Sequence, residues 1–150
     1  MSDLRDLYQQ TILDHTRKPR NKHEMSDATA TADGHNPLCG DKIKLFLKVS
    51  NGIIEDISFT GNGCAIYTAS ASMMTEALKG KSLAEVQALF ERFHTMLTSP
   101  MDRDPDIEVL DKLAVFSGVR EFPVRVKCAT LPWHTLQAAI KHEHRPVSTE

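Results

Sequence analysis

The sequence has few of the features that mark nucleic-acid-binding, membrane or secreted proteins. Its formal net charge at pH 7 is only −2, so charge gives no drive toward nucleic acid or an anionic membrane surface. The most apolar stretch, residues 43–49, is interrupted by Lys44 and Lys48, which excludes a membrane span. The first six residues carry acids and no apolar run, so no signal peptide is expected. We therefore expect a cytoplasmic protein that binds neither nucleic acid nor membrane.

The chain also lacks the motifs of several common enzyme classes. It has no phosphate-binding glycine loop and no pair of cysteines two residues apart beside a His-x-Glu, which zinc deaminases require. The spacing singles out no histidine as the partner of a nucleophilic cysteine, as a cysteine protease would need. With 150 residues and no internal repeat, we expect one domain over residues 1–150, with a frayed tail from about residue 143.

Only three cysteines are present. An odd number without a secretory signal favours reduced thiols over a disulfide framework. Cys39, Cys64 and Cys128 lie beside glycines, a lysine or expected helix starts, and none belongs to an apolar stripe. These settings stabilise the thiolate, the form that binds metal and attacks sulfur. The alternative for each cysteine is a small buried hydrophobic residue.

Two alternating segments between Cys39 and Cys64 predict a β-hairpin, over residues 41–49 and 53–60. A two-residue turn would place apolar residues opposite polar ones. A three-residue turn with a glycine bulge would instead pair Val49 with Ile53 and Leu45 with Ile57, so it is the predicted register. Because a hairpin returns the chain to its starting point, the two thiols at its ends can meet.

The remaining pattern is mainly helical. Helices are predicted over residues 4–16, 65–78, 83–97, 107–116 and 130–142. The third of these begins with a capping box, Ser82 and Glu85. We expect a short strand at 28–32, a polar break at 99–106 and an extended or turned segment at 122–127. Pro132 would fall in the first turn of the last helix.

Asp41 completes a possible ligand set. It lies two residues beyond Cys39 and across a glycine, so both side chains can turn toward one point. Three thiols and one carboxylate suit a soft or borderline metal. With Zn²⁺ the charge would be +2 − 3 − 1 = −2, which favours nearby cations such as Arg125 and Lys127. Carboxylate binds a soft centre less firmly than thiolate, so such a site suits exchange better than permanent stapling.

The chain closely resembles the IscU/NifU-N family of iron–sulfur cluster assembly proteins. The resemblance rests on motifs that span nearly the whole chain: Asp14-His15, Pro19-Arg20-Asn21, Asn36-Pro37-x-Cys39-Gly40-Asp41, Gly61-x-Gly63-Cys64-x-Ile66 and Lys127-Cys128-Ala129-Thr130-Leu131-x-Trp133. Two features favour the SufU branch. Lys127 stands where IscU-type scaffolds have histidine. The interval from Cys64 to Cys128 (128 − 64 = 64 positions) is long enough for the SufU insertion, here within residues 93–120.

The resemblance implies an α+β fold with a small antiparallel sheet packed against several helices. It also implies a Zn²⁺ ion held by Cys39, Asp41, Cys64 and Cys128, and a SufS-type cysteine desulfurase as partner. In the family picture, a histidine of the desulfurase enters the zinc sphere and frees Cys39, which accepts the persulfide sulfur. The chain would then act as a zinc-dependent sulfurtransferase accessory to the desulfurase.

Two positive residues and two alternative functions complete the expectations. Arg125 and Lys127 would steady the thiolate or meet an acidic surface of the partner. The first alternative function is a scaffold that builds a [2Fe–2S] cluster on the same four ligands and passes it to apo-proteins or other assembly proteins. The second is a zinc-stapled binding module without catalytic function.

Overall fold

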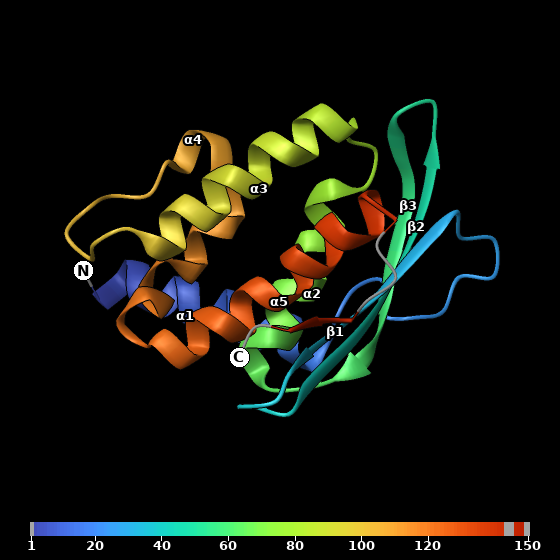
Figure 1. The fold of residues 1–150 in the computed structure, drawn as a ribbon. Helices are drawn as coiled ribbons and strands as arrows, with labels where there is room; N and C mark the ends of the chain where they lie inside the picture. The colour runs from blue at the N-terminus through green and yellow to red at the C-terminus, as the bar shows by residue number, and fades with distance from the viewer. Residues whose placement is uncertain (1, 143–145, 149–150) are drawn as a thin grey trace.

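The computed structural model describes residues 2–142 and 146–148. Figure 1 shows the helices gathered on one side of a small sheet. The elements follow one another as α1 (Ser2–Arg17), β1 (Ala30–Asn36), β2 (Asp41–Ser50), β3 (Ile53–Asn62), α2 (Ala65–Leu78), α3 (Leu83–Thr98), α4 (Ile107–Leu110), the 3₁₀ helix η1 (Asp111–Glu121), α5 (Pro123–Ile140) and β4 (Val147–Ser148).

The strands lie in the order β3-β2-β1-β4. Neighbouring strands among β1, β2 and β3 pair antiparallel, whereas β4 pairs parallel with β1. The predicted α+β class is therefore confirmed, with β4 making the sheet mixed. The strand expected at 28–32 is present as β1, two residues later and longer. The tail predicted to fray from residue 143 lies partly outside the described residues, and its described part contains β4.

The turn between β2 and β3 differs from the prediction. Ser50, and not Val49, pairs with Ile53, so the turn has two residues. These are Asn51, with φ of 53°, and Gly52, with φ of 74°. Two successive left-handed residues match the twist of the flanking strands, and Asn-Gly is the sequence that best tolerates them. The predicted three-residue turn is wrong.

A bulge in the hairpin places apolar residues of the two strands opposite each other, as the predicted three-residue turn would also have done. The register shifts by one residue at Lys48–Val49. Beyond this shift Leu45 pairs with Phe59 and Leu47 pairs with Ile57. All four side chains are fully buried. An extra residue in one strand changes which residues face each other, and here it keeps the apolar residues of both strands on one face.

The helices before residue 99 agree with the sequence, and those after it agree less well. Ser82 and Glu85 form the predicted capping box. The helix expected at 107–116 is a four-residue α4 followed by η1. The segment 122–127 is mostly helical, because α5 already begins at Pro123. Proline fits the first helical position, where its missing N–H has no intrahelical partner.

This earlier start moves two residues into the interior of α5. Cys128 lies inside the helix and not before its start. Pro132 lies beyond the first turn, so the prediction for it is wrong. Since proline has no N–H, it cannot donate to the carbonyl group of Cys128 four residues earlier.

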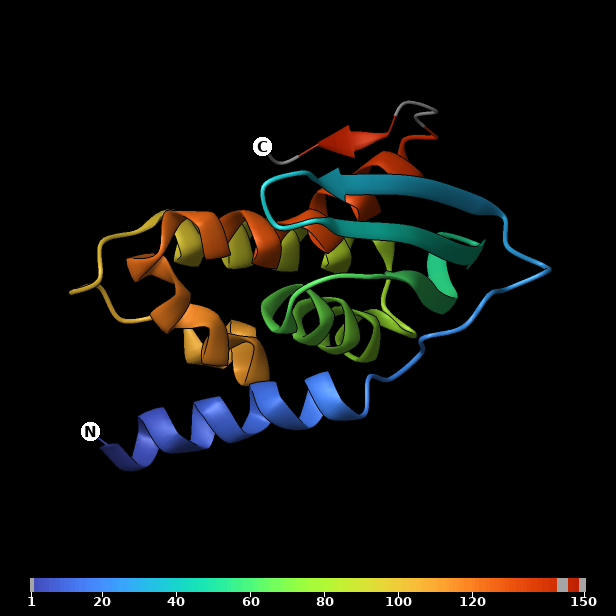
Figure 2. The same cartoon turned by 90° about the horizontal axis from the view of Figure 1, so that it is seen from below.

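Helices α2 and α5 pack on one face of the sheet, and α1 covers the far side of α2 (Figure 2). The small side chains of α2 at residues 69–72 are fully buried, which allows close approach to neighbouring elements. Trp133 of α5 stacks on Phe93 of α3 with ring centroids 4.5 Å apart. This packing brings the start of α2 and the first half of α5 to the end of the sheet where β1 turns into β2. No helix in the described part of the chain is long and apolar enough to cross a membrane.

Candidate metal centre

The residues predicted to bind a metal meet at one end of the sheet. Cys39 lies in the turn between β1 and β2, and Asp41 is the first residue of β2. Cys64 is the N-cap of α2, and Cys128 faces them from α5. Gly40 has φ of 72°, a left-handed conformation that glycine adopts without strain. Three segments that are distant in the sequence thus supply the four side chains.

The geometry of these side chains allows them to hold a metal ion. One ligand atom each from Cys39, Asp41 and Cys128 lie within 4.8 Å of one another. The sulfur atoms of Cys39 and Cys128 are 2.9 Å apart. Cys64 Sγ lies 3.8 Å from Asp41 Oδ2. Ligands around a tetrahedral zinc ion are roughly 3.3–3.8 Å apart, given bond lengths of about 2.0–2.3 Å. Cys64 is not a member of the compact group, so its sulfur would have to move toward Cys39 and Cys128 to complete a four-ligand sphere.

The surroundings of Asp41 also fit a cation. Its side chain is fully buried, and its Oδ1 accepts a hydrogen bond from the backbone N–H of Cys64 at 2.8 Å. Among the side chains that the structure describes, no lysine, arginine or histidine forms an ion pair with it. A buried carboxylate without a nearby positive charge is unfavourable. A Cβ atom at Gly63 would collide with this carboxylate and with the ring of Tyr67, so glycine is required there.

Burial raises the pKa of the Cys64 thiol, and the N–H groups of Tyr67 and Ile66 act in the opposite direction. Burial also raises the pKa of the Cys128 thiol, and the nearby Cys39, Asp41 and Cys64 add to the increase. A bound cation would reverse both effects, because it stabilises the thiolates. The expectation that a helix N-terminus assists the thiolate is wrong for Cys128, which lies inside α5.

The two positive residues predicted near the site do not contact its thiols. Arg125 is exposed, and its guanidinium lies 4.5 Å from the centroid of the Phe122 ring. Lys127 is half-buried beside Cys128 in α5. Neither donates a hydrogen bond to a cysteine among the described contacts.

One contact with a thiol was not anticipated. Asn36, the last residue of β1, is fully buried, and its side-chain Nδ2 donates to Cys128 Sγ at 3.5 Å. The Asn-Pro pair before Cys39 is a sequence signal for a turn. The sulfur contact, however, joins residues 92 positions apart, and only the tertiary structure places them together.

Ser70 of α2 fixes α5 beside the site. Its hydroxyl donates to the carbonyl oxygen of Ala129 at 2.6 Å and accepts from Trp133 Nε1 at 3.2 Å. Both bonds are buried, and Ala129 directly follows Cys128. The helix capped by Cys64 is therefore held to the helix that carries Cys128.

Comparisons with known proteins agree with this arrangement. The sequence model of the NifU-like N terminal domain matches residues 7–129. The chain is 41% identical to the zinc-dependent sulfurtransferase SufU of Bacillus subtilis, over 95% of each protein. It is 42% identical to the iron–sulfur cluster assembly scaffold protein IscU of Streptococcus pyogenes, over 94% of this chain and 87% of that protein.

A solved structure shares the fold. It is the crystal structure of a candidate iron–sulfur cluster assembly scaffold protein for the SUF system from Fervidobacterium islandicum. The two align with a TM-score of 0.80 and 32% identity, over 87% of this chain and 93% of the other. The domain match, the two relatives and this structure agree: the chain belongs to the NifU-like N-terminal domain family, the IscU/NifU family to which its motifs pointed.

Proposed function

We propose that this chain is an iron–sulfur cluster assembly protein that accepts persulfide sulfur from a SufS-type cysteine desulfurase. Cys39, Asp41, Cys64 and Cys128 would hold a Zn²⁺ ion, and Cys39 would accept the sulfur. The observation that carries this proposal is the meeting of three thiols and one buried carboxylate at one end of the sheet. The likeness to a zinc-dependent sulfurtransferase supports it.

The donor set fits zinc, because thiolate and carboxylate are both established zinc ligands. When bound, Zn²⁺ would supply the positive charge that keeps the thiols ionised at neutral pH. The chain supplies the rest. The Cys64 N–H orients the carboxylate of Asp41, and the packing of α5 fixes Cys128.

Cys39 is the best placed of the three thiols to react with a partner. Cys39 and Cys64 are both partly exposed, whereas Cys128 is only 1% exposed. Of the two, Cys64 Sγ accepts a hydrogen bond from the N–H of Tyr67 at the start of α2, and Cys39 lies in the turn between β1 and β2. The neighbouring Leu38 is 61% exposed, so the turn projects from the sheet. Arg125 and Lys127 lie upstream of Cys128 on α5 and could meet acidic groups of the desulfurase beside this turn.

The proposed transfer balances without an added oxidant or reductant. The Cys39 thiolate attacks the terminal sulfur of the desulfurase persulfide. A new sulfur–sulfur bond forms on Cys39 while the bond in the donor persulfide breaks. The desulfurase cysteine leaves as a thiolate, and the persulfide proton remains on the transferred sulfur.

Cys39→Ala tests this assignment. We expect the variant to fold but to fail to stimulate desulfurase turnover in the presence of thiols. Peptide mass spectrometry of the wild type should find one extra sulfur atom on Cys39. As a matched control, Leu38→Ala alters the same turn without removing a thiol and should still acquire sulfur. Full stimulation by Cys39→Ala would refute the acceptor role.

A scaffold function on the same residues is the second candidate. Three converging thiols can bind a [2Fe–2S] cluster as well as zinc, and one relative is named as a scaffold. In that case the cluster would be cargo delivered to apo-proteins. Anaerobic reconstitution followed by transfer to an apo-ferredoxin separates the two functions, because a sulfur acceptor alone would deliver no intact cluster.

A further inference from the structure

The side chain of Asn36 contacts both the turn of Cys39 and the sulfur of Cys128. Its Oδ1 accepts from the backbone N–H of Leu38 at 3.2 Å, and its backbone carbonyl accepts from the N–H of Cys39 at 3.3 Å. Its Nδ2 donates to Cys128 Sγ at 3.5 Å. The residue is fully buried, so its amide has little access to water in place of these partners.

These contacts fix the orientation of the amide group. An asparagine side chain has one acceptor oxygen and one donor nitrogen, and the two are interchangeable by a flip. The Leu38 N–H can bond only to the oxygen. The nitrogen must therefore face Cys128, where its N–H meets the sulfur.

The three thiols differ in the N–H donors that they receive. Cys64 Sγ accepts from the backbone N–H of Tyr67 at 3.4 Å. Cys128 Sγ accepts from Asn36. Among the described contacts, Cys39 Sγ receives no N–H donor, and its polar neighbour is the thiol of Cys128. Among these contacts, two sulfur atoms thus accept a hydrogen bond from an N–H group, and the sulfur of Cys39 does not.

We infer that Asn36 is a positioning residue that keeps Cys128 as a retained metal ligand and leaves Cys39 as the thiolate that is released to react. This inference rests on the proposed function. A hydrogen bond to a thiolate stabilises the charged form and lowers its nucleophilicity. Groups that hydrogen-bond to a metal ligand in this way also tune its affinity for the metal. The same side chain also shapes the turn that carries Cys39. One residue therefore affects both the retained ligand, Cys128, and the released ligand, Cys39.

Two substitutions separate these roles. Asn36→Asp keeps the size and the acceptor for Leu38 but removes the donor to Cys128, whereas Asn36→Ala removes both. Asn62→Asp is the matched control, because it adds the same charge at an exposed position at the end of β3. Both Asn36 variants should bind Zn²⁺ about 10- to 100-fold more weakly, the usual cost of losing a partner of a metal ligand. The control should bind as the wild type does.

Spectroscopy and alkylation report on the sulfur atoms directly. In the Co²⁺-loaded protein, both Asn36 variants should shift the thiolate-to-cobalt charge-transfer band to lower energy. With limiting iodoacetamide, the wild type should be modified first at Cys39. Asn36→Asp should increase the alkylation of Cys128. Because aspartate has the same size as asparagine, Cys128 stays as buried as in the wild type.

A measurement on the wild type keeps the test decisive if a variant fails to fold. In the ¹¹³Cd-loaded protein, the inferred bond predicts a scalar coupling between the metal and a side-chain amide proton of Asn36. No such coupling, or an Asn36→Asp variant with wild-type affinity and an unchanged cobalt spectrum, would overturn the inference. None of these measurements needs a desulfurase. A failed desulfurase assay would instead count against the proposed function.

Discussion

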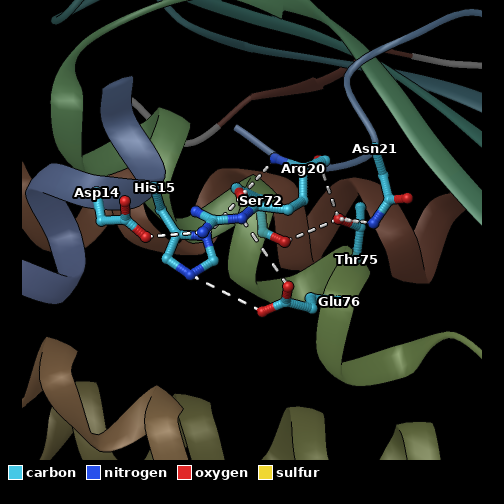
Figure 3. Close-up of polar contacts among 7 residues, drawn as sticks. All are labelled: Asp14, His15, Arg20, Asn21, Ser72, Thr75 and Glu76. Atoms are coloured by element: carbon cyan, nitrogen blue, oxygen red, sulfur yellow. Dashed lines mark hydrogen bonds and ion pairs between the residues drawn. The ribbon is translucent and has the colours of Figure 1, made fainter. Parts of the chain in front are cut away.

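Helix α2 takes part in two polar clusters that differ in how their groups are satisfied. One is the candidate metal centre at its N-cap. The other, the α1–α2 network, joins α1 and the segment after it to the middle of α2 (Figure 3). Its members are Asp14, His15, Arg20, Asn21, Ser72, Thr75 and Glu76.

Hydrogen bonds and ion pairs within the protein satisfy nearly all of the α1–α2 network. The Ser72 hydroxyl lies 2.7 Å from His15 Nδ1 and accepts from the backbone N–H of Arg20 at 2.8 Å. The guanidinium of Arg20 donates to Asp14 at 2.7 Å, and only its Nη1 lacks a partner in the described part of the chain. The side-chain amide of Asn21 also donates a hydrogen bond to Thr75 of α2. In the metal centre, by contrast, no positive side chain that the structure describes pairs with the buried carboxylate of Asp41.

The comparison indicates different roles for the two clusters. A polar cluster whose groups are paired within the protein gains little from a ligand, so the α1–α2 network should serve stability. A cluster whose charge is not compensated gains much from a cation, so the metal centre should serve binding. Substitutions in the two clusters should therefore affect different measurements.

The largest effect is expected from Cys128→Ala. With Zn²⁺ present, the free energy of unfolding should fall by about 3 kcal/mol or more, because zinc binding of about 10–16 kcal/mol is shared among four ligands and contributes to folding. Urea unfolding with saturating zinc and with excess chelator measures this. The chelated proteins provide the control for lost packing. An equal difference between variant and wild type in both conditions would show that Cys128 is not a ligand.

A smaller effect, without loss of metal, is expected from Ser72→Ala. The substitution leaves His15 Nδ1 and the Arg20 N–H unpaired in a buried place, which should cost about 2–3 kcal/mol of unfolding free energy. Zinc stoichiometry and affinity should stay unchanged. A variant that lost zinc affinity as well would show that the two clusters are coupled along α2.

The α1–α2 network should also make stability depend on pH. Burial lowers the pKa of His15 below its usual 6.5, and the charge of Arg20 lowers it further, against an opposing effect of Glu76. The unfolded state therefore takes up a proton more readily than the folded state. The stability due to neutral His15 is present above pH 6.5 and is lost as pH falls through this value toward the lower folded pKa.

His15→Gln should consequently show a shallower loss of stability than the wild type between about pH 7.5 and about pH 5.5, the interval around an ordinary histidine pKa. Thermal unfolding at saturating zinc measures the difference. Effects of metal binding and of His134, whose pKa burial also lowers, are common to both proteins and cancel. Parallel pH profiles would remove His15 as the cause.

The sequence predicted features set by local patterns and missed those set by tertiary packing. α2 was predicted with its observed ends, because small and apolar residues lie between Cys64 and Gly80. The start of α5 was missed because Val124 and Val126 favour strands locally, and tertiary contacts override this preference. The sequence also predicted that Cys39 and Asp41 lie close to Cys64, because the hairpin returns the chain to its starting point. The contact between Asn36 and Cys128 depends on how α5 packs on the sheet, which no local pattern encodes.

The smallest effect is expected from Ser58→Ala, which completes the comparison between paired and unpaired groups. Ser58 lies in β3 and is fully buried, as Ser72 is, but its hydroxyl has no hydrogen-bond partner among the described residues. Removing an unpaired buried hydroxyl abolishes a desolvation cost and breaks no bond. Urea unfolding should therefore find a change within about 0.5 kcal/mol, or a slight gain in stability. If Ser58→Ala instead destabilised the protein as much as Ser72→Ala, burial of the serine would explain both losses, and the hydrogen bonds of the α1–α2 network would not be their cause.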